Sequence, residues 1–164
     1  MSNHEEHERR EGHEAQSGQQ GGREGEKTSS PWLRMRLPSP LSPEAELVMT
    51  ETIGAAIAVH RELGPGFMEA IYHRAMLIEL QSRRLMYESE RPVKVLYHGV
   101  EIPGQRIDLI VERLIIVEIK AVVRLDRVHE AQVISYLKTT GLRGGLLINF
   151  SAATLRQGLR RIVV

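Results

Sequence analysis

An acidic and a basic residue interrupt a nearly continuous apolar run of the sequence. Glu118 and Lys120 lie within residues 114–123, where almost all of their neighbours are aliphatic. Residues two positions apart point to the same face of a β-strand, so these two side chains share one face. Burying a carboxylate and an ammonium group is costly unless they are paired with each other or bind a ligand. The pair is therefore the first candidate for chemistry.

A second carboxylate precedes this pair in another strand-like segment. Asp108 is the lone acid of the sequence RIDLIV, and a candidate tight turn at residues 112–113 separates the two runs. If that turn makes the strands antiparallel, Asp108 and Glu118 converge. Two carboxylates held close repel each other, and a hard divalent cation such as Mg²⁺ or Mn²⁺ would neutralise them. Lys120 could then orient a water molecule or stabilise charge on a phosphoryl group.

A structural explanation competes with this one. Glu118 could form an ion pair with Lys120 or Arg106 that serves only to keep the carboxylate buried. The second acid, Asp108, ten residues earlier in the sequence, weakens this alternative, because a simple ion pair does not require it.

Polar residues at helical spacing could complete such a site. Gln132 and Tyr136 are four residues apart, and so are Glu69 and His73, so each pair shares a face of a predicted helix. Gln132 or Tyr136 could contact a substrate or the lysine from above the sheet. The alternatives are a cap or a core contact for the glutamine and tyrosine, a solvent-exposed glutamate, and a histidine without ligand partners.

Several short motifs together resemble a known family. Residues 66–72 read G-x-x-E-x-x-Y, and the later motifs are Asp108, the E-I-K of residues 118–120 and the Q-V-I-S-Y of residues 132–136. With them, residues 45–164 closely resemble the GxxExxY proteins, a small bacterial family assigned to the PD-(D/E)XK nuclease-like superfamily. One position departs from the superfamily's name, since Ile107 rather than proline precedes the aspartate.

The resemblance implies an α/β fold with a PD-(D/E)XK restriction-endonuclease-like core, in which helices flank a small mixed β-sheet. The catalytic residues that it implies are Glu69, Asp108, Glu118, Lys120, Gln132 and Tyr136. The three acids are implied to ligate Mg²⁺ or Mn²⁺, and the lysine to position or polarise the attacking water. The glutamine and the tyrosine are implied to contact DNA or the lysine.

The elements that must position these residues alternate between helical and strand patterns. Ser42-Pro43 is a helix-start signal, and the Gly-Pro-Gly of residues 64–66 ends a largely apolar helix near Leu63. The later elements are expected as a helix over 67–84, strands over 93–97, 106–111, 114–123 and 145–150, a helix from 126 or 127 through 137, and a closing segment over 155–164. This order predicts an α/β protein with a mixed sheet.

Composition limits the classes of protein that remain. The absence of cysteine excludes disulfides, thiolate catalysis, cysteine zinc sites and iron–sulfur clusters, and it favours the cytoplasm. No apolar run reaches the length of about 18 residues that a membrane span needs. Residues 1–41 are predicted to form a disordered charged tail and a proline-rich linker, and residues 42–164 a single nuclease-like domain.

The leading hypothesis is a metal-dependent nuclease that hydrolyses phosphodiester bonds of nucleic acid, with DNA favoured over RNA. The net charge of +1 gives no overall attraction to phosphates, but the acidic excess lies in the first 31 residues, which leaves the domain basic. One alternative is a catalytically silent nuclease-fold module that binds nucleic acid or a protein partner. Another is hydrolysis of a small phosphorylated molecule. A homodimer or a protein partner could supply selectivity, and no membrane partner is expected.

Overall fold

The computed structural model describes residues 39–164. The predicted charged tail and linker, residues 1–41, lie outside this range except for their last three residues. Of these, Leu41 is only 7% exposed and belongs to the hydrophobic core. The packed region therefore includes at least one residue that the sequence assigned to the linker. The disorder of the tail stays a prediction.

Four helices and five strands follow one another in the described region. They are α1 (Pro43–Leu63), α2 (Glu69–Ser82), β1 (Tyr87–Tyr97), β2 (Val100–Val111), β3 (Ile115–Lys120), α3 (Arg127–Thr140), β4 (Gly144–Asn149), α4 (Leu155–Gly158) and β5 (Leu159–Val163). None of the helices in this region has the length and apolarity that a membrane span requires.

The five strands form one mixed sheet in the order β1-β2-β3-β4-β5. All neighbours pair antiparallel except β3 and β4, which are parallel. A parallel pair needs a crossover connection, and α3 supplies it. The predicted α/β architecture with a small mixed sheet and flanking helices is confirmed.

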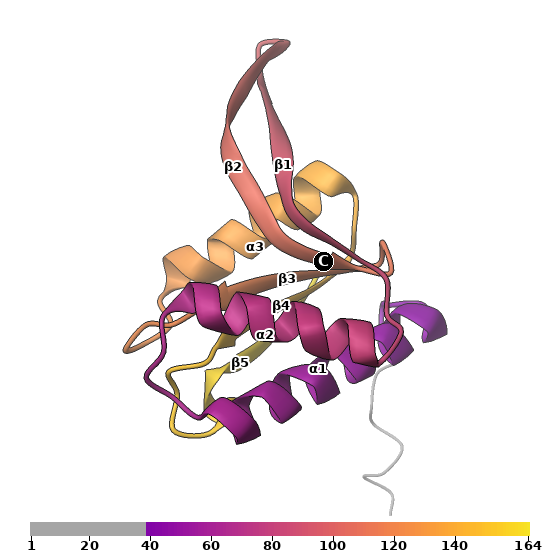
Figure 1. Ribbon diagram of the computed structural model, residues 1–164. Coiled ribbons are helices and arrows are strands. Elements are labelled where there is room, and N and C mark those ends of the chain that lie inside the picture. Colours follow the sequence, from indigo (N-terminus) through magenta and orange to yellow (C-terminus); the bar gives the residue numbers. More distant parts are fainter. Residues whose placement is uncertain (1–38) are drawn as a thin grey trace, which may run out of the picture. The chain divides into compact units, whose positions relative to one another are not determined.

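Helices cover both faces of the sheet, and Figure 1 shows α1 and α2 on one side and α3 on the other. The core accordingly has two clusters. On the α1/α2 side the sheet contributes alternate residues such as Val117, Ile119 and Leu146, whereas on the α3 side it contributes Ile116 and Leu147. The alternation follows from the twofold repeat of a strand, and it predicts that Glu118, like Ile116, faces α3.

Local signals explain the helix boundaries. The hydroxyl of Ser42 accepts a hydrogen bond from the backbone N–H of Ala45, and Pro43 occupies the first helical position, as predicted. α3 begins with a capping box between Asp126 and His129. The C-cap of α3 is Gly141, which has a φ of 74°, a conformation that suits glycine. Its backbone N–H donates a hydrogen bond to the carbonyl of Leu137.

Several strand and helix ends differ from the sequence prediction. α2 starts at Glu69 rather than at Phe67, because the backbone N–H of Phe67 donates to the hydroxyl of Tyr72 at the end of the preceding loop. β2 extends back to Val100, so it pairs with β1 along a much longer hairpin than expected. β3 ends at Lys120 rather than at residue 123, because its parallel partner β4 ends at Asn149, directly opposite Lys120.

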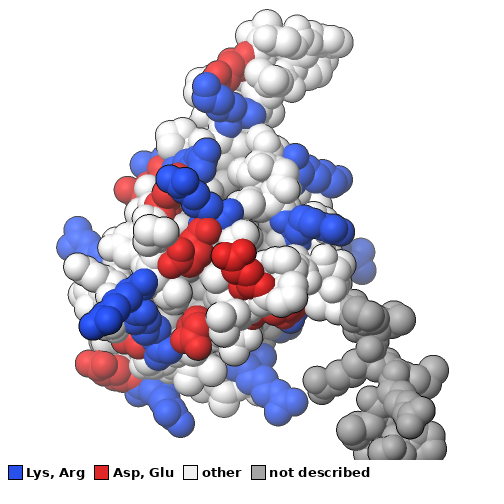
Figure 2. All heavy atoms as spheres, turned by 90° about the vertical axis from the view of Figure 1, so that its right-hand side faces the viewer, with Lys and Arg blue, Asp and Glu red and all other residues white. Residues whose placement is uncertain are grey.

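The β1–β2 hairpin projects from the body as a twisted arm (Figure 1). Residues 94–104, called here the distal arm, are exposed except for half-buried Val95. Figure 2 shows that the far end of the arm stands clear of the body and that no Lys, Arg, Asp or Glu is visible at its very tip on this face. Over the face in that view, basic and acidic side chains are interspersed.

Candidate active site

The carboxylate of Asp108 lies where β2 and β3 separate. The antiparallel pairing of these strands extends as far as Leu109↔Val117. Asp108 precedes Leu109 on β2 and so lies just beyond the last paired position. Its Oδ2 accepts a hydrogen bond of 2.8 Å from the backbone N–H of Ile119. The aspartate side chain thus satisfies a strand donor at the point where the pairing stops. The predicted antiparallel arrangement, which brings Asp108 beside the strand of Glu118, is confirmed.

Glu118 is buried, with an exposed fraction of 2%. Its Oε1 lies 2.5 Å from Lys120 Nζ, so the predicted pairing of these two residues along one strand face is confirmed. Its other carboxylate oxygen, Oε2, is also buried and has no hydrogen-bond partner in the described part of the chain. Arg106, the other candidate partner of Glu118, instead pairs with Glu90, with 3.6 Å between Arg106 Nη1 and Glu90 Oε1. One buried acceptor is therefore left over.

The electrostatics of the three charged groups are coupled. Burial raises the pKa of Glu118 to about 7, and the nearby charge of Asp108 adds to this against the opposing effect of Lys120. Burial also raises the pKa of Asp108, although the hydrogen bond from Ile119 opposes the shift. Burial alone would lower the pKa of Lys120, but its hydrogen bond and charge interaction with Glu118 outweigh that and raise it. The lysine is therefore protonated at neutral pH, whereas Glu118 changes its ionisation state near that pH.

Gln132 and Tyr136 lie on α3, above the sheet face of these acids. Gln132 Nε2 donates to the Tyr136 hydroxyl at 2.7 Å, and that hydroxyl donates to the backbone carbonyl of Arg106 at 3.0 Å. Burial raises the pKa of Tyr136, and the negative charges of Glu118 and Asp108 contribute to the rise. The phenol is therefore neutral and close to the acids. Contact of either residue with Lys120 or DNA stays a prediction.

Glu69 is exposed at the first position of α2. It lines an open hollow of about 380 Å³ together with Asp108 and with Glu90 and Arg106 from the base of the arm. Its charge contributes to the raised pKa of Glu118, so it lies within electrostatic range of the other acid. The structure thus places Glu69 on the same side as the acids, while its role as a metal ligand stays a prediction.

His73 also lines this hollow. Its Nε2 lies 3.2 Å from the Ser89 hydroxyl and 3.4 Å from the backbone carbonyl of Asp108. The sequence singled it out only by its spacing from Glu69, and this spacing was the available signal. Tyr72 of the same motif has a different place, because it is fully buried and donates its hydroxyl to the carbonyl of Gly64 at 2.7 Å.

Asn149 is a residue of the site region that the sequence prediction missed. It is 3% exposed, it lies opposite Lys120 at the end of β4, and its side chain exchanges two hydrogen bonds with the backbone of Val122. These bonds fix the chain just after the lysine. The signal that could have revealed it is a lone amide near the end of an otherwise apolar strand.

The donor set at this end of β3 fits a hard divalent cation. Glu118 Oε2 is a buried carboxylate oxygen without a partner, and a second carboxylate lies beside it. Within residues 39–164, no three His, Cys, Asp or Glu side chains are grouped closely enough to hold a metal ion. Mg²⁺ commonly binds through one or two carboxylates and keeps several water molecules, so a site with two carboxylates fits its coordination.

Comparison with known proteins agrees with this geometry. No curated protein and no solved structure matches the chain at a significant level. Residues 46–162, from α1 to the last strand, match the family model described as the PD-(D/E)XK nuclease superfamily. This match spans the two strands that carry Asp108, Glu118 and Lys120. The chain therefore belongs to the PD-(D/E)XK nuclease superfamily.

Proposed function

We propose that this protein is a metal-dependent nuclease that hydrolyses phosphodiester bonds in nucleic acid, with DNA favoured over RNA. The observation that supports the proposal is the junction of β2 and β3, where Asp108, Glu118 and a protonated Lys120 meet. Membership of the nuclease superfamily supports a nuclease-type activity in general terms. The substrate, the ion and the site residues belong to the proposal.

Asp108 and Glu118 would hold Mg²⁺ or Mn²⁺, with Glu69 at the start of α2 supporting the ion through a water molecule. When bound, such an ion supplies positive charge for the developing phosphate charge and favours ionisation of a water molecule. Lys120 keeps its proton because Glu118 Oε1 lies 2.5 Å away, so it can donate a hydrogen bond to the attacking water or to a phosphate oxygen. Tyr136, tied to the Arg106 carbonyl, orients the start of the buried part of β2.

Finer assignments belong to the same proposal. The G-x-x-E-x-x-Y of residues 66–72 supports the proposal that the protein is one of the bacterial GxxExxY proteins. The cysteine-free sequence favours a cytoplasmic location. The partner is nucleic acid, and a second copy of the chain or another protein is the candidate source of selectivity.

One observation favours the alternative of a catalytically silent binding module. Lys120 already neutralises one oxygen of Glu118 within the protein, as a purely structural ion pair would. In that case nucleic acid or protein binding survives the loss of Asp108 and Glu118, and divalent ions leave the stability of the protein unchanged.

The test is cleavage of end-labelled single-stranded DNA, duplex DNA and RNA by the full chain with Mn²⁺. Glu118→Gln and Lys120→Ala are expected to abolish cleavage, while Glu62→Gln, the same change at an exposed position of α1, leaves it intact. Circular dichroism and melting temperature verify that each variant is folded. Wild-type activity that persists in folded Glu118→Gln contradicts the proposed site, and no cleavage of any substrate favours the silent module.

A further inference from the structure

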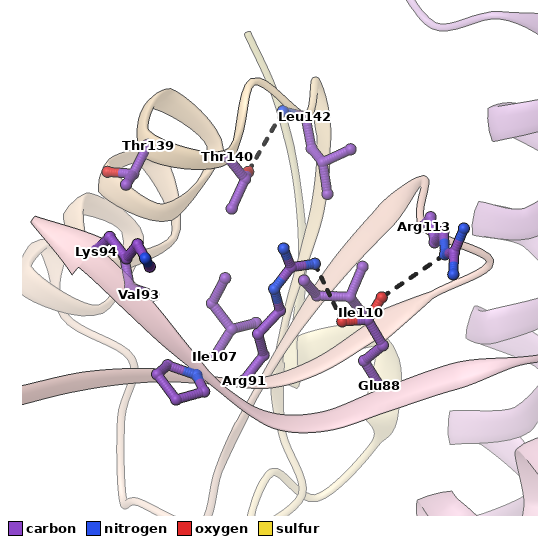
Figure 3. Close-up of a pocket in the computed structure, with 11 residues that line it drawn as sticks. Glu88, Arg91, Val93, Lys94, Ile107, Ile110, Arg113, Thr139, Thr140 and Leu142 are labelled. Carbon is purple, nitrogen blue, oxygen red and sulfur yellow. Dashed lines mark hydrogen bonds and ion pairs between the residues drawn. The ribbon is translucent and has the colours of Figure 1, made fainter.

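A second hollow of about 600 Å³ lies between β1, β2 and the end of α3, and Figure 3 shows the residues that line it. We call it the arm–helix groove. It shares no lining residue with the hollow beside Asp108. Its volume is in the range of small-molecule and nucleotide sites. The mechanism proposed above does not use it.

The groove combines a basic rim with an apolar floor. Arg91, Lys94 and Arg113 are basic, and Glu88 is the one acid among the lining residues. Below them the floor consists of aliphatic side chains, including Val93, Ile107 and Ile110. An excess of two positive charges over an apolar surface suits a ligand that carries phosphates and also has planar, weakly polar parts.

Glu88 organises two of the basic side chains. Its Oε2 lies 3.0 Å from Arg91 Nη1, and its Oε1 lies 3.8 Å from Arg113 Nε. In Figure 3, Arg91 extends from β1 into the space below the end of α3, while Arg113 stands at the other side of Glu88. The exposed fraction is 40% for the Glu88 side chain, 52% for Arg91 and 85% for Arg113. Both guanidinium groups therefore keep N–H donors available to a ligand.

The backbone of Arg113 gives an independent indication. It has a φ of 59° and follows Glu112 with a φ of 49°, in the tight turn between β2 and β3. Glycine and asparagine are the residues that tolerate this conformation best, and arginine is strained there. Glu112 has a structural use, because its Oε1 accepts a hydrogen bond from the backbone N–H of Met86. Apart from its ion pair with Glu88, Arg113 makes no such bond within the described residues, and its side chain lines the groove.

The groove and the candidate active site share two elements, β2 and α3. Ile107 of the floor directly precedes Asp108 on β2, and Thr140 of the rim lies one helical turn, about 6 Å, from Tyr136 on α3. Tyr136 is the residue whose hydroxyl is close to the acids of the site. The hollow beside Asp108 is lined from α2 and the groove from the end of α3, on the other side of the sheet, so the groove is a separate surface on the elements that carry the site.

We infer that the arm–helix groove binds the sugar–phosphate backbone of a nucleic-acid strand, at a surface separate from the hollow beside Asp108. Phosphate oxygens lie against Arg91, Lys94 and Arg113, and a base packs over Pro92 and Leu142 at the apolar floor. This inference rests on the proposed nuclease function, and it adds to that function a second surface that contacts the substrate. It also makes the β1–β2 hairpin part of the substrate-binding surface.

The experiment measures binding of a fluorescein-labelled 12-nucleotide single-stranded DNA to the full chain in EDTA, so that no metal-dependent cleavage occurs. Arg113→Gly and Lys94→Gln are each expected to weaken binding about 3- to 10-fold at 0.1 M salt. Each should also reduce the slope of log K against log salt by about 0.7, the value for one lost phosphate contact with a single strand. Arg61→Gln, an exposed basic residue near the end of α1, is the matched control and leaves both quantities unchanged.

Arg113→Gly also resolves the question of folding. Glycine relieves the positive φ, so this variant should melt at the same temperature as the wild type or higher. Weaker binding by a protein that is at least as stable cannot be attributed to unfolding. Unchanged affinity and unchanged salt slope in both groove variants overturn the inference.

Two further outcomes separate this inference from the proposed function. If the variants weaken DNA binding but the wild type cleaves nothing with Mn²⁺, the groove stands and the nuclease function fails. If the oligonucleotide does not bind, but thymidine 5′-monophosphate binds with the same dependence on Arg113, the groove is a site for a free nucleotide. Binding of a nucleic-acid strand in the groove is then overturned.

Discussion

The ammonium group of Lys120 lies 2.5 Å from Glu118 Oε1, while Oε2 of the same carboxylate is buried without a partner in the described region. The two oxygens of one side chain therefore have different surroundings. One is neutralised within the protein, and the other is left for a group that the chain does not supply. This asymmetry is the physical basis for the predictions that follow.

Removal of Lys120 should reveal how much free energy the burial of the Glu118 carboxylate costs. Lys120→Met removes the partner that lowers the pKa of Glu118, so at pH 8 the folded protein must keep an unpaired buried carboxylate or take up a proton there. Either should lower the free energy of unfolding, by about 3 kcal/mol. At pH 5 the loss should be much smaller, because Glu118 takes up a proton. Urea denaturation measures both values. The double variant Lys120→Met with Glu118→Gln should recover most of the loss, and strictly additive losses would contradict the pairing.

The stability of the wild type should depend on pH through Glu118. Its pKa is about 7 in the folded protein and near 4.5 in the unfolded chain. Between these values the folded state holds a proton that the unfolded state has released, so stability is greatest at low pH and falls as pH rises through 7. The difference amounts to about 3 kcal/mol at most, from 1.36 kcal/mol per unit of pKa shift.

The measurement is urea denaturation at several pH values from 5 to 8 in the presence of EDTA. Glu118→Gln is the control, since it removes the titrating group and keeps the shape of the side chain. The wild type should lose stability relative to this variant as pH increases. Parallel profiles for the two proteins would show that the burial of Glu118 has little effect on its ionisation.

Glu69 should affect metal binding rather than folding. It is exposed at the start of α2, so Glu69→Gln should leave the melting temperature within about a degree or two of the wild type, as surface changes usually do. The Mn²⁺ concentration for half-maximal cleavage should rise about 10-fold, with nearly normal turnover at saturating Mn²⁺. An unchanged Mn²⁺ requirement would mean that Glu69 does not support the ion.

Tyr136→Phe separates a positioning role from a direct one. The variant loses the hydrogen bond to the Arg106 carbonyl, which should cost about 1 kcal/mol of stability because that carbonyl loses its side-chain donor. If Tyr136 only positions β2, cleavage should fall by less than 10-fold, with most of the effect on KM. A fall of more than 100-fold in kcat, without further loss of stability, would mean that the hydroxyl contacts the reacting groups.

The sequence was sufficient to predict the central strands because their chemistry depends on local spacing. Glu118 and Lys120 share a face through the twofold repeat of a strand, and the turn that brings Asp108 beside them spans only a few residues. The same holds for the first helix, whose start at Pro43 and end at Gly64 are determined by local caps. These features need no knowledge of distant contacts.

The remaining features depend on contacts between residues far apart in the sequence. Asp108 binds the backbone of Ile119 only because the strands separate there, and Asn149 reaches Val122 only because β3 and β4 are parallel neighbours. His73 approaches Asp108 through the packing of α2 against the sheet. No pattern in a single segment specifies such approaches, so the sequence predicted the residue types of the site but only part of its membership.

The projecting arm has a consequence for the motions of the protein. Its distal part is exposed on both faces, and a two-stranded ribbon of this kind is only marginally stable by itself. Its amide hydrogens should therefore exchange with solvent through local opening, whereas those of Val117 and Leu146, buried at the centre of the sheet, exchange only when the whole domain unfolds. Glu90 and Arg106 lie between the arm, which opens locally, and the centre of the sheet, which opens only on global unfolding. Both residues line the hollow beside Asp108. One wall of the hollow thus borders the least protected part of the sheet, while the other is formed by α2.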